Sequence, residues 1–301
     1  MTNVTSVRSI VSISDVFVEG AKISAHSCTM NGLGSTNDGS MFAILLMNTS
    51  IDGQSLITIA DLKLQVAAAD TDGFAGALEA VDSHVSDVNV SVVNVTCISP
   101  NTRVAVVLIQ NTTVDGAIIA IDFVYMSGVT SSFAINLLSS VVAKSVMSAT
   151  NVNLSTSSAT GYVISVQYKA SVPAPSRLIN TSIVISNAHT ASTLVKTFNV
   201  SITATRITVN HTVMSSIMTA SFFAIYLDAT SIAGQSLITL ADLKLRMTSA
   251  GTDGYAGALQ AADSRVGDVN VSVVNVTCIS PNTRVAVVLI QNTTVDGAII
   301  A

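Results

Sequence analysis

The stretch Asn89–Gly116, NVSVVNVTCISPNTRVAVVLIQNTTVDG, decides the fold because it occurs twice in the chain. It lies in a segment of 34 residues (120 − 87 + 1), Asp87–Ala120, that is identical to Asp268–Ala301 at an offset of 181. With substitutions, the duplication relates residues 21–120 to residues 200–301. Repeated units usually stack on one elongated core instead of forming separate globules. We therefore expect residues 1–301 to form a single continuous solenoid, and we interpret the chain as a fragment of a longer one.

A shorter pattern recurs inside the large repeat. Val90–Cys97 alternates apolar and polar residues and then slips phase at Asn94. Alternation rich in Val, Ile and Thr is typical of strands, and Asn or Asp accepts the left-handed backbone of a sharp corner. From Ala25 to Ala204 six steps cover 179 residues, about 30 per unit. A ladder of stacked corner residues is predicted at Asp61, Asn94, Asp122, Asn151, Asn187, Asp242 and Asn275.

Strand, corner, strand and loop, repeated at this spacing, predict an all-β parallel β-helix. The frame resembles the right-handed parallel β-helix of the pectate-lyase-like superfamily, in which an Asn ladder lines one tight corner. The composition, rich in Asn, Ser, Thr and Val, also resembles large repetitive predicted surface proteins of free-living protists. The resemblance implies the fold and the role of the corner Asn residues, and it carries over no catalytic residue.

An antiparallel fold is the alternative. Asp-Gly pairs between apolar runs are a hairpin signal, and tandem β-sandwich domains would also fit the length. The recurrence of the Asn frame at the length of a coil, and not of a hairpin, favours the β-helix. The Asp-Gly pairs begin at Asp38, Asp52, Asp72, Asp115, Asp253 and Asp296.

The composition limits the partners of the chain. Only 10% of residues are charged, the net charge is −5 and no basic stripe is present, so we expect no nucleic-acid partner. No apolar run approaches the ~18 residues of a membrane-spanning helix. The N-terminal sequence lacks a signal-peptide pattern, which indicates either a cytoplasmic protein or a fragment that begins after its signal.

Sequons, Asn-X-Ser/Thr, are numerous. They indicate a glycosylated extracellular or cell-surface protein, although a β-helix rich in Asn and Thr would also produce them by composition. Two of them, Asn94 and Asn275, fall on the predicted ladder, where we expect the side chains to turn inward. Asn111 and Asn292 precede a turn and are expected to be accessible. The candidate glycosylation sites are Asn48, Asn89, Asn111, Asn153, Asn180, Asn270 and Asn292.

The sequence predicts no catalytic, cofactor-binding or metal-ligating residue. The three cysteines form no CxxC pair, and we interpret Cys28 and Cys97 as core residues that share the last position of the frame. The histidines lack the local spacing of a metal pair. For an enzyme, the resemblance to this superfamily implies a catalytic cluster: carboxylates with calcium and a basic residue, or an Asp pair with a His. Charged residues over 123–169 are instead isolated by neutral neighbours.

These observations favour a non-enzymatic, extracellular or surface-displayed, membrane-associated repeat protein with a structural or adhesive role. Its expected partners are carbohydrate or another cell-surface protein. The first alternative is a polysaccharide lyase or glycoside hydrolase of the β-helix class, active or degenerate. The second is an intracellular repeat scaffold.

Overall fold

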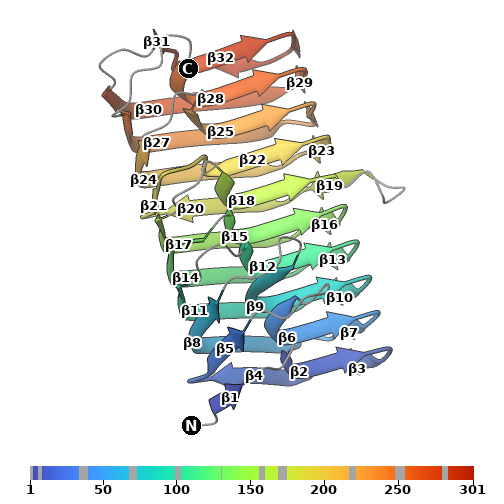
Figure 1. The fold of residues 1–301 in the computed structure, drawn as a ribbon. Coiled ribbons are helices and arrows are strands. Elements are labelled where there is room, and N and C mark those ends of the chain that lie inside the picture. Colours follow the sequence, from blue (N-terminus) through green and yellow to red (C-terminus); the bar gives the residue numbers. More distant parts are fainter. Residues whose placement is uncertain are drawn as a thin grey trace.

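The computed structural model describes residues 3–5, 9–33, 40–67, 73–98, 103–129, 131–155, 160–168, 175–216, 222–247, 255–279 and 284–301. Within these ranges the chain forms strands β1 to β34 and no helix, so no described segment is a helix that could span a membrane. The strands join into three sheets, A, B and C, that run the length of the molecule (Figure 1).

Sheet A contains the longest strands and is bounded as follows: β1 (Asn3–Thr5), β4 (Lys22–His26), β5 (Thr29–Leu33), β8 (Leu56–Ala67), β11 (Asn89–Ile98), β14 (Ile118–Ser127), β17 (Val146–Ser155), β20 (Ser182–Ser186), β21 (His189–Thr190), β24 (Arg206–Ser216), β27 (Ser236–Met247), β30 (Val269–Ile279) and β34 (Ile299–Ile300).

Sheet B carries the groove described below: β2 (Ser9–Ser14), β6 (Met41–Met47), β9 (Phe74–Val81), β12 (Arg103–Gln110), β15 (Ser131–Leu138), β18 (Thr160–Gln167), β22 (Val195–Phe198), β25 (Phe222–Asp228), β28 (Tyr255–Ala262), β31 (Arg284–Val285) and β32 (Val288–Gln291).

Sheet C consists of short strands: β3 (Phe17–Glu19), β7 (Ser50–Asp52), β10 (His84–Ser86), β13 (Thr113–Asp115), β16 (Val141–Ala143), β19 (Ser176–Ile179), β23 (Val200–Thr203), β26 (Ser231–Ala233), β29 (Arg265–Gly267) and β33 (Thr294–Asp296).

Each coil passes through sheet B, then C, then A, as β9, β10 and β11 do. Successive coils pair in parallel, so that β11 lies between β8 and β14. From Leu56 to Asn270 the register advances 214 residues in seven steps, which is about 31 residues per coil. The prediction of an all-β parallel solenoid with coils of about 30 residues is confirmed.

The antiparallel alternative is wrong, because every strand pair of the described residues is parallel. Three of the Asp-Gly pairs lie between a sheet C strand and the next sheet A strand. Their glycines, Gly53, Gly116 and Gly297, have φ values of 70°, 64° and 64°, so they turn the chain at a coil corner and not at a hairpin. Asp38, Asp72 and Asp253, the first residues of the other three pairs, lie outside the described residues.

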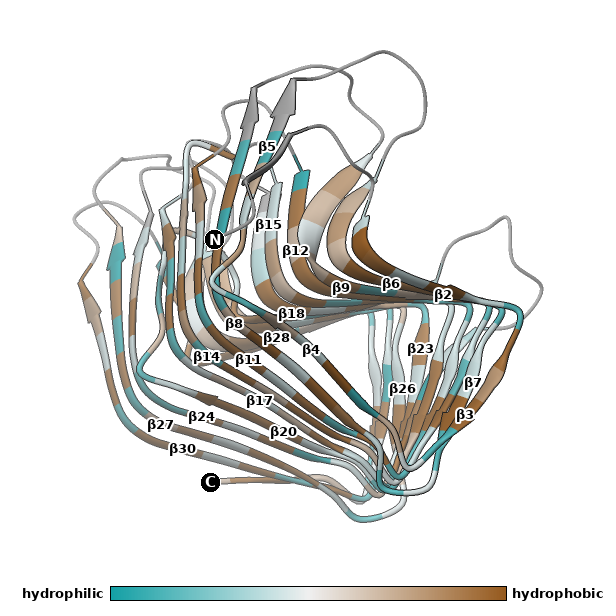
Figure 2. Ribbon diagram, turned by 90° about the horizontal axis from the view of Figure 1, so that it is seen from below, coloured by the Kyte–Doolittle hydropathy of each residue, from teal (hydrophilic) through white to brown (hydrophobic). Residues whose placement is uncertain are grey.

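The core fills the interior of the coils. In β11 the side chains of Val92 and Val95 are both buried, although they are three residues apart. Asn94, between them, has a φ of 58°, and this left-handed residue shifts the alternation by one so that both legs of the strand face inward. Figure 2, a view along the solenoid, shows that sheet A is bent.

Sheet B strands contain a second shift of phase. In β12 the adjacent residues Val106 and Val107 both pack into the main core, whereas Ala105 and Leu108 belong to a separate apolar cluster. Two consecutive inward residues require the strand to bend between them, because side chains of a straight strand alternate. The bend is visible in Figure 2 and gives sheet B a concave outer face.

Candidate functional site

A groove of about 670 Å³ lies on this concave outer face of sheet B, over strands β9, β12, β15, β18 and β22. Its size is that of small-molecule and oligomer sites, which are concave, mostly apolar and lined by few polar groups. It is lined by Ser40, Phe74, Glu79, Arg103, Leu108, Gln110, Ser131, Phe133, Asn136, Leu138, Tyr162, Gln167 and Lys196.

Aromatic rings form one side of the groove. The ring centroids of Phe74 and Phe133 are 6.0 Å apart, and those of Phe133 and Tyr162 are 5.8 Å apart. Phe133 and Tyr162 are register partners on adjacent strands, so their rings stack along the solenoid. Phe74 and Tyr162 are half-buried, so part of each ring is open to solvent.

Two cations stand over these rings. The guanidinium carbon of Arg103 is 5.9 Å from the Phe74 centroid, and Lys196 Nζ is 5.2 Å from the Tyr162 centroid and 3.2 Å from its hydroxyl oxygen. Contacts of this kind orient a cation without neutralising it. Among the described residues the ion pairs lie elsewhere, Lys144 with Asp115 and His211 with Asp242. Arg103 and Lys196 therefore form no ion pair with a carboxylate of the described residues.

Asn136 on β15 supplies the floor of the groove with a polar group that has no partner. The residue is 2% exposed, and its Oδ1 forms no hydrogen bond within the described part of the chain. A buried acceptor without a partner costs about 1–3 kcal/mol. Because its register neighbour is Leu108, an apolar residue would fit the same position. A hydroxyl or amide that donates to Oδ1 would remove this cost.

Glu79 is the one carboxyl group among the residues that line the groove. It is 8% exposed, and burial raises its pKa from 4.5 to about 7 because the charged form is poorly solvated. A carboxyl with this pKa exchanges protons near neutrality. Four register steps separate Glu79 from Lys196, through Leu108, Asn136 and Ser165, about 19 Å at the usual strand spacing.

The arrangement is therefore suited to binding. It offers ring faces, two cations, a buried acceptor and one carboxyl group that is half-protonated near pH 7. The described residues that line the groove include one carboxyl group, whereas hydrolysis of a glycosidic bond ordinarily uses two.

Sequence reasoning missed this site. The available signal is a pair of adjacent apolar residues in mid-strand, at Ala77–Leu78, Val106–Val107 and Ala134–Ile135, which predicts the bend. In two of these strands the next residue is polar, Glu79 or Asn136, within an otherwise apolar run.

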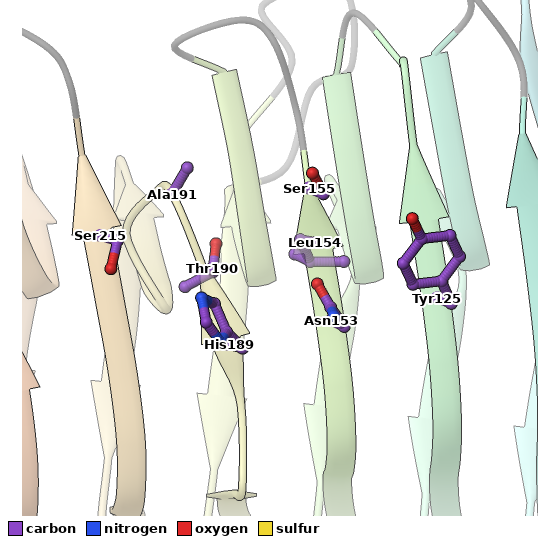
Figure 3. Close-up of a pocket in the computed structure, with 8 residues that line it drawn as sticks. All are labelled: Tyr125, Asn153, Leu154, Ser155, His189, Thr190, Ala191 and Ser215. Carbon is purple, nitrogen blue, oxygen red and sulfur yellow. The ribbon is translucent and has the colours of Figure 1, made fainter.

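A second, smaller pocket of about 350 Å³ lies on the outer face of sheet A, where β21 is only two residues long. Tyr125, Asn153 and His189 are register partners on β14, β17 and β21 and lie side by side in Figure 3. Tyr125 is 41% exposed. The pocket holds no carboxylate and is shallow, but it places one candidate glycosylation site, Asn153, between two rings.

The predicted ladder residues lie along the bend of sheet A. Side-chain amides of one coil donate to side-chain oxygens of the coil before it, at 2.6 Å from Asn94 to Asp61 and 2.8 Å from Asn151 to Asp122. Asn187 donates to Oδ1 of Asn151 at 3.3 Å. Asn275 donates to Asp242, whose other oxygen lies 3.4 Å from His211 Nε2.

The structure differs from the predicted ladder in three places. Asp122 is not the corner residue of its coil, because Phe123 has the left-handed backbone, with a φ of 53°. The ladder position before Asp242 belongs to His211, and Ala204 turns a different corner. Asn94 and Asn275 are exposed and do not turn inward, because the corner lies on the convex side of the bend.

The other candidate glycosylation sites divide into two groups. Asn48, Asn111 and Asn292 lie at the corner between sheets B and C, and their amides donate to Asp15, Asp82 and Asp263 of the neighbouring coil. All seven sites are exposed, Asn111 and Asn292 among them. The side chains of the remaining four form no hydrogen bond within the described residues; they are Asn89, Asn153, Asn180 and Asn270.

The cysteines do not share one position. Cys97 is fully buried and pairs with Leu64, whose partner in the preceding coil is Met30 and not Cys28. Cys28 and Cys278 are half-buried, and none of the three forms a disulfide. Among the described residues no group of three His, Cys, Asp or Glu side chains is close enough to hold a metal ion.

Comparison with known proteins adds little to these observations. No family model matches the chain, and no curated protein matches it. The alignment with the periplasmic alginate epimerase AlgG has 8% identity and a TM-score of 0.23, and it covers 89% of this chain and 76% of the other. For the A-module of Azotobacter vinelandii mannuronan C-5 epimerase AlgE6 the identity is 8% and the TM-score 0.22, with 90% of this chain and 91% of the other covered. For a Yersinia enterocolitica family 28 exopolygalacturonase the identity is 9% and the TM-score 0.21, with 96% of this chain and 72% of the other covered. At these values no residue role is transferred from them.

Proposed function

We propose that the protein binds an extended carbohydrate chain in the groove on sheet B and does not cleave it. The observation that carries this proposal is the unpartnered Oδ1 of Asn136 in the groove floor. Carbohydrates present hydroxyl donors at every unit, and such a donor would satisfy the buried oxygen. The half-buried rings of Phe74 and Tyr162 supply apolar contact to the sugar faces, and Arg103 and Lys196 favour a chain that carries carboxylates.

The proposal includes an extracellular or cell-surface location, with a structural or adhesive role. It is supported by the sequons and by the exposed positions of Asn89, Asn153, Asn180 and Asn270.

Binding is tested by calorimetry with polygalacturonate, with its methyl ester and with a neutral glucan. We expect the carboxylated chain to bind, the ester to bind more weakly and the glucan weakest. Asn136→Leu removes the acceptor and should weaken binding about 5- to 30-fold, the equivalent of one hydrogen bond of 1–2 kcal/mol. The matched control is Asn153→Leu on sheet A, which should bind as the native protein does. Absence of binding to all three polymers, or native affinity in Asn136→Leu, would refute the proposal.

An enzyme acting on the same ligand is the second candidate, and Glu79 is the observation in its favour. A carboxyl with a pKa of about 7 is suited to general acid or base catalysis. Release of unsaturated or reducing sugar ends by the native protein, lost in Glu79→Gln, would establish this candidate. We expect no release, because Glu79 has no second carboxylate beside it among the groove residues.

A further inference from the structure

Cations over aromatic rings recur along the outer face of sheet B beyond the groove. Near the C-terminal coils the guanidinium carbon of Arg284 is 5.7 Å from the Tyr255 centroid, and its Nη1 donates to the Tyr255 hydroxyl at 3.2 Å. This pair is the copy of Arg103 with Phe74, because both residues are displaced by 181. The same register connects each pair, Arg103 with Phe74 and Arg284 with Tyr255.

Lys196 lies between these pairs along the solenoid. Besides Tyr162, its Nζ contacts the ring of Tyr226 on the following strand at 5.6 Å, so the lysine bridges two coils. The path from β12 to β22 passes β15 and β18, and the path from β22 to β31 passes β25 and β28. Each path is three coil steps, about 14 Å at a strand spacing of 4.8 Å. The backbone positions of the three cationic residues are therefore equally spaced along the axis, and the side chains of Arg103 and Arg284 both reach back over a ring of the preceding coil.

All three cations belong to sheet B, but only Lys196 lies in its central column of register partners; Arg103 and Arg284 stand five residues before Leu108 and Leu289 of that column. A single outward column of register partners runs from Glu79 through Asn136 and Lys196 to Gln260. Within this column Glu79 is the one acidic residue, and in the duplicated copy its position is taken by the neutral Gln260. Beside the column, the carboxylate of Asp228 interacts with the hydroxyl of Tyr226.

We infer that Arg103, Lys196 and Arg284 act together as a comb of three cations that binds one carboxylated polysaccharide chain along the solenoid axis. The inference rests on the proposed function and adds to it a second binding element, Arg284 with Tyr255, outside the groove. A chain held at three points binds more tightly than a chain held at two, because each further contact is intramolecular. Affinity should therefore depend on ligand length in steps of about 14 Å.

The test measures the affinity of oligogalacturonates of increasing length for the full chain. For the native protein we expect a gain of at least tenfold when the oligomer becomes long enough, about 29 Å, to span the three cations. Arg284→Gln should abolish this last gain and leave the affinity for shorter oligomers unchanged. Arg103→Gln should reduce the affinity for all lengths. Arg265→Gln, on sheet C and off this face, is the matched control and should behave as the native protein does.

The outcomes separate the comb from the proposed function. If short oligomers bind and Arg284→Gln retains the full gain with length, the comb is refuted and the groove remains a binding site. If the native protein binds no oligomer, the proposed function fails and the comb fails with it. If the affinity for single-stranded oligonucleotides rose with length by the same factor, the face would bind polyanions in general, and the proposal of a carbohydrate ligand would be refuted.

Discussion

The side-chain amide of Asn151 donates a 2.8 Å hydrogen bond to Oδ1 of Asp122, although the two residues do not occupy equivalent backbone positions. In the register Asp122 pairs with Thr150, and Asn151 stands opposite Phe123. The carboxylate of Asp122 also accepts the backbone amide of Phe123 at 3.0 Å. Asp122 therefore continues the hydrogen-bonded ladder, although Phe123, the next residue, occupies the left-handed corner position.

Asn151→Ala should lower the free energy of unfolding by about 1–3 kcal/mol. The variant loses the bonds to Asp122 and from Asn187, and it places alanine at a φ of 52°, which asparagine accepts more readily than alanine does. Urea denaturation measures the change. Asn153→Ala, two residues later on the exposed face, should stay within about 0.5 kcal/mol. Equal effects of the two substitutions would show that the ladder does not stabilise the coils.

Gly76→Ala should destabilise the protein by about 2–3 kcal/mol or more. A Cβ at this position would overlap the Ala105 carbonyl oxygen and the ring of Phe42. Gly267 is the matched control, because its nearest neighbour is the Asp296 carbonyl oxygen at 3.5 Å and the equivalent residue of the first copy is Ser86. Thermal melting of both variants tests the contrast. A Gly76→Ala protein as stable as Gly267→Ala would contradict the packing of Phe42 on this strand.

Burial of Glu79 predicts a pH dependence of stability. Its pKa is about 7 in the folded state against 4.5 ordinarily, so the charged form is disfavoured by folding. Below about pH 4.5 both states are protonated and no stability is lost. As the pH rises from 4.5 to 7, Glu79 ionises in the unfolded state but stays largely protonated in the folded state. The free energy of unfolding therefore falls by an amount of order 3 kcal/mol, and this decrease is complete above about pH 7.

Glu79→Gln isolates this contribution. Its stability, compared with that of the native protein in urea titrations at pH 4 and pH 8, should be similar at pH 4 and higher at pH 8. Gln260 already occupies the equivalent position of the second copy, so the amide fits a strand of this kind. Glu19, the other glutamate of the chain, is exposed on sheet C, and Glu19→Gln serves as the control. If the free energies of unfolding of the native protein and of Glu79→Gln differed by the same amount at both pH values, the raised pKa of Glu79 would be refuted.

Glycan occupancy should follow the hydrogen bonding of the amides. When the chain is secreted from eukaryotic cells behind a signal peptide, we expect glycan on Asn89 and Asn153 and none on Asn94 or Asn111 of the folded protein. A sugar attaches to Nδ2, and at Asn94 and Asn111 this atom lies within hydrogen-bond distance of an aspartate one coil away. Mass spectrometry of glycopeptides, with and without glycosidase, gives the answer. Occupied Asn94 beside bare Asn89 would reverse the prediction.

Much of the fold was predictable because its determinants are local. The alternation of apolar and polar residues shifts by one position at Asn94, and this shift recurs about every 30 residues, which indicates a corner in each coil. The corner has the left-handed backbone that Asn accepts. Phe123 shows the limit of this reasoning. A phenylalanine at a φ of 53° is contrary to its own preference, and the turn persists there because the coils on both sides fix the path of the strand.

By itself, the sequence determined the solenoid, since alternation and corner chemistry act within a few residues and the repeat spacing sets the coil. Only the tertiary structure decided the groove. Glu79, Asn136 and Lys196 are far apart in the sequence, and they share a face because loops of unequal length still bring each coil into register with the one before it. The burial that raises the pKa of Glu79 and leaves Oδ1 of Asn136 without a partner arises from that stacking and from the bend of sheet B.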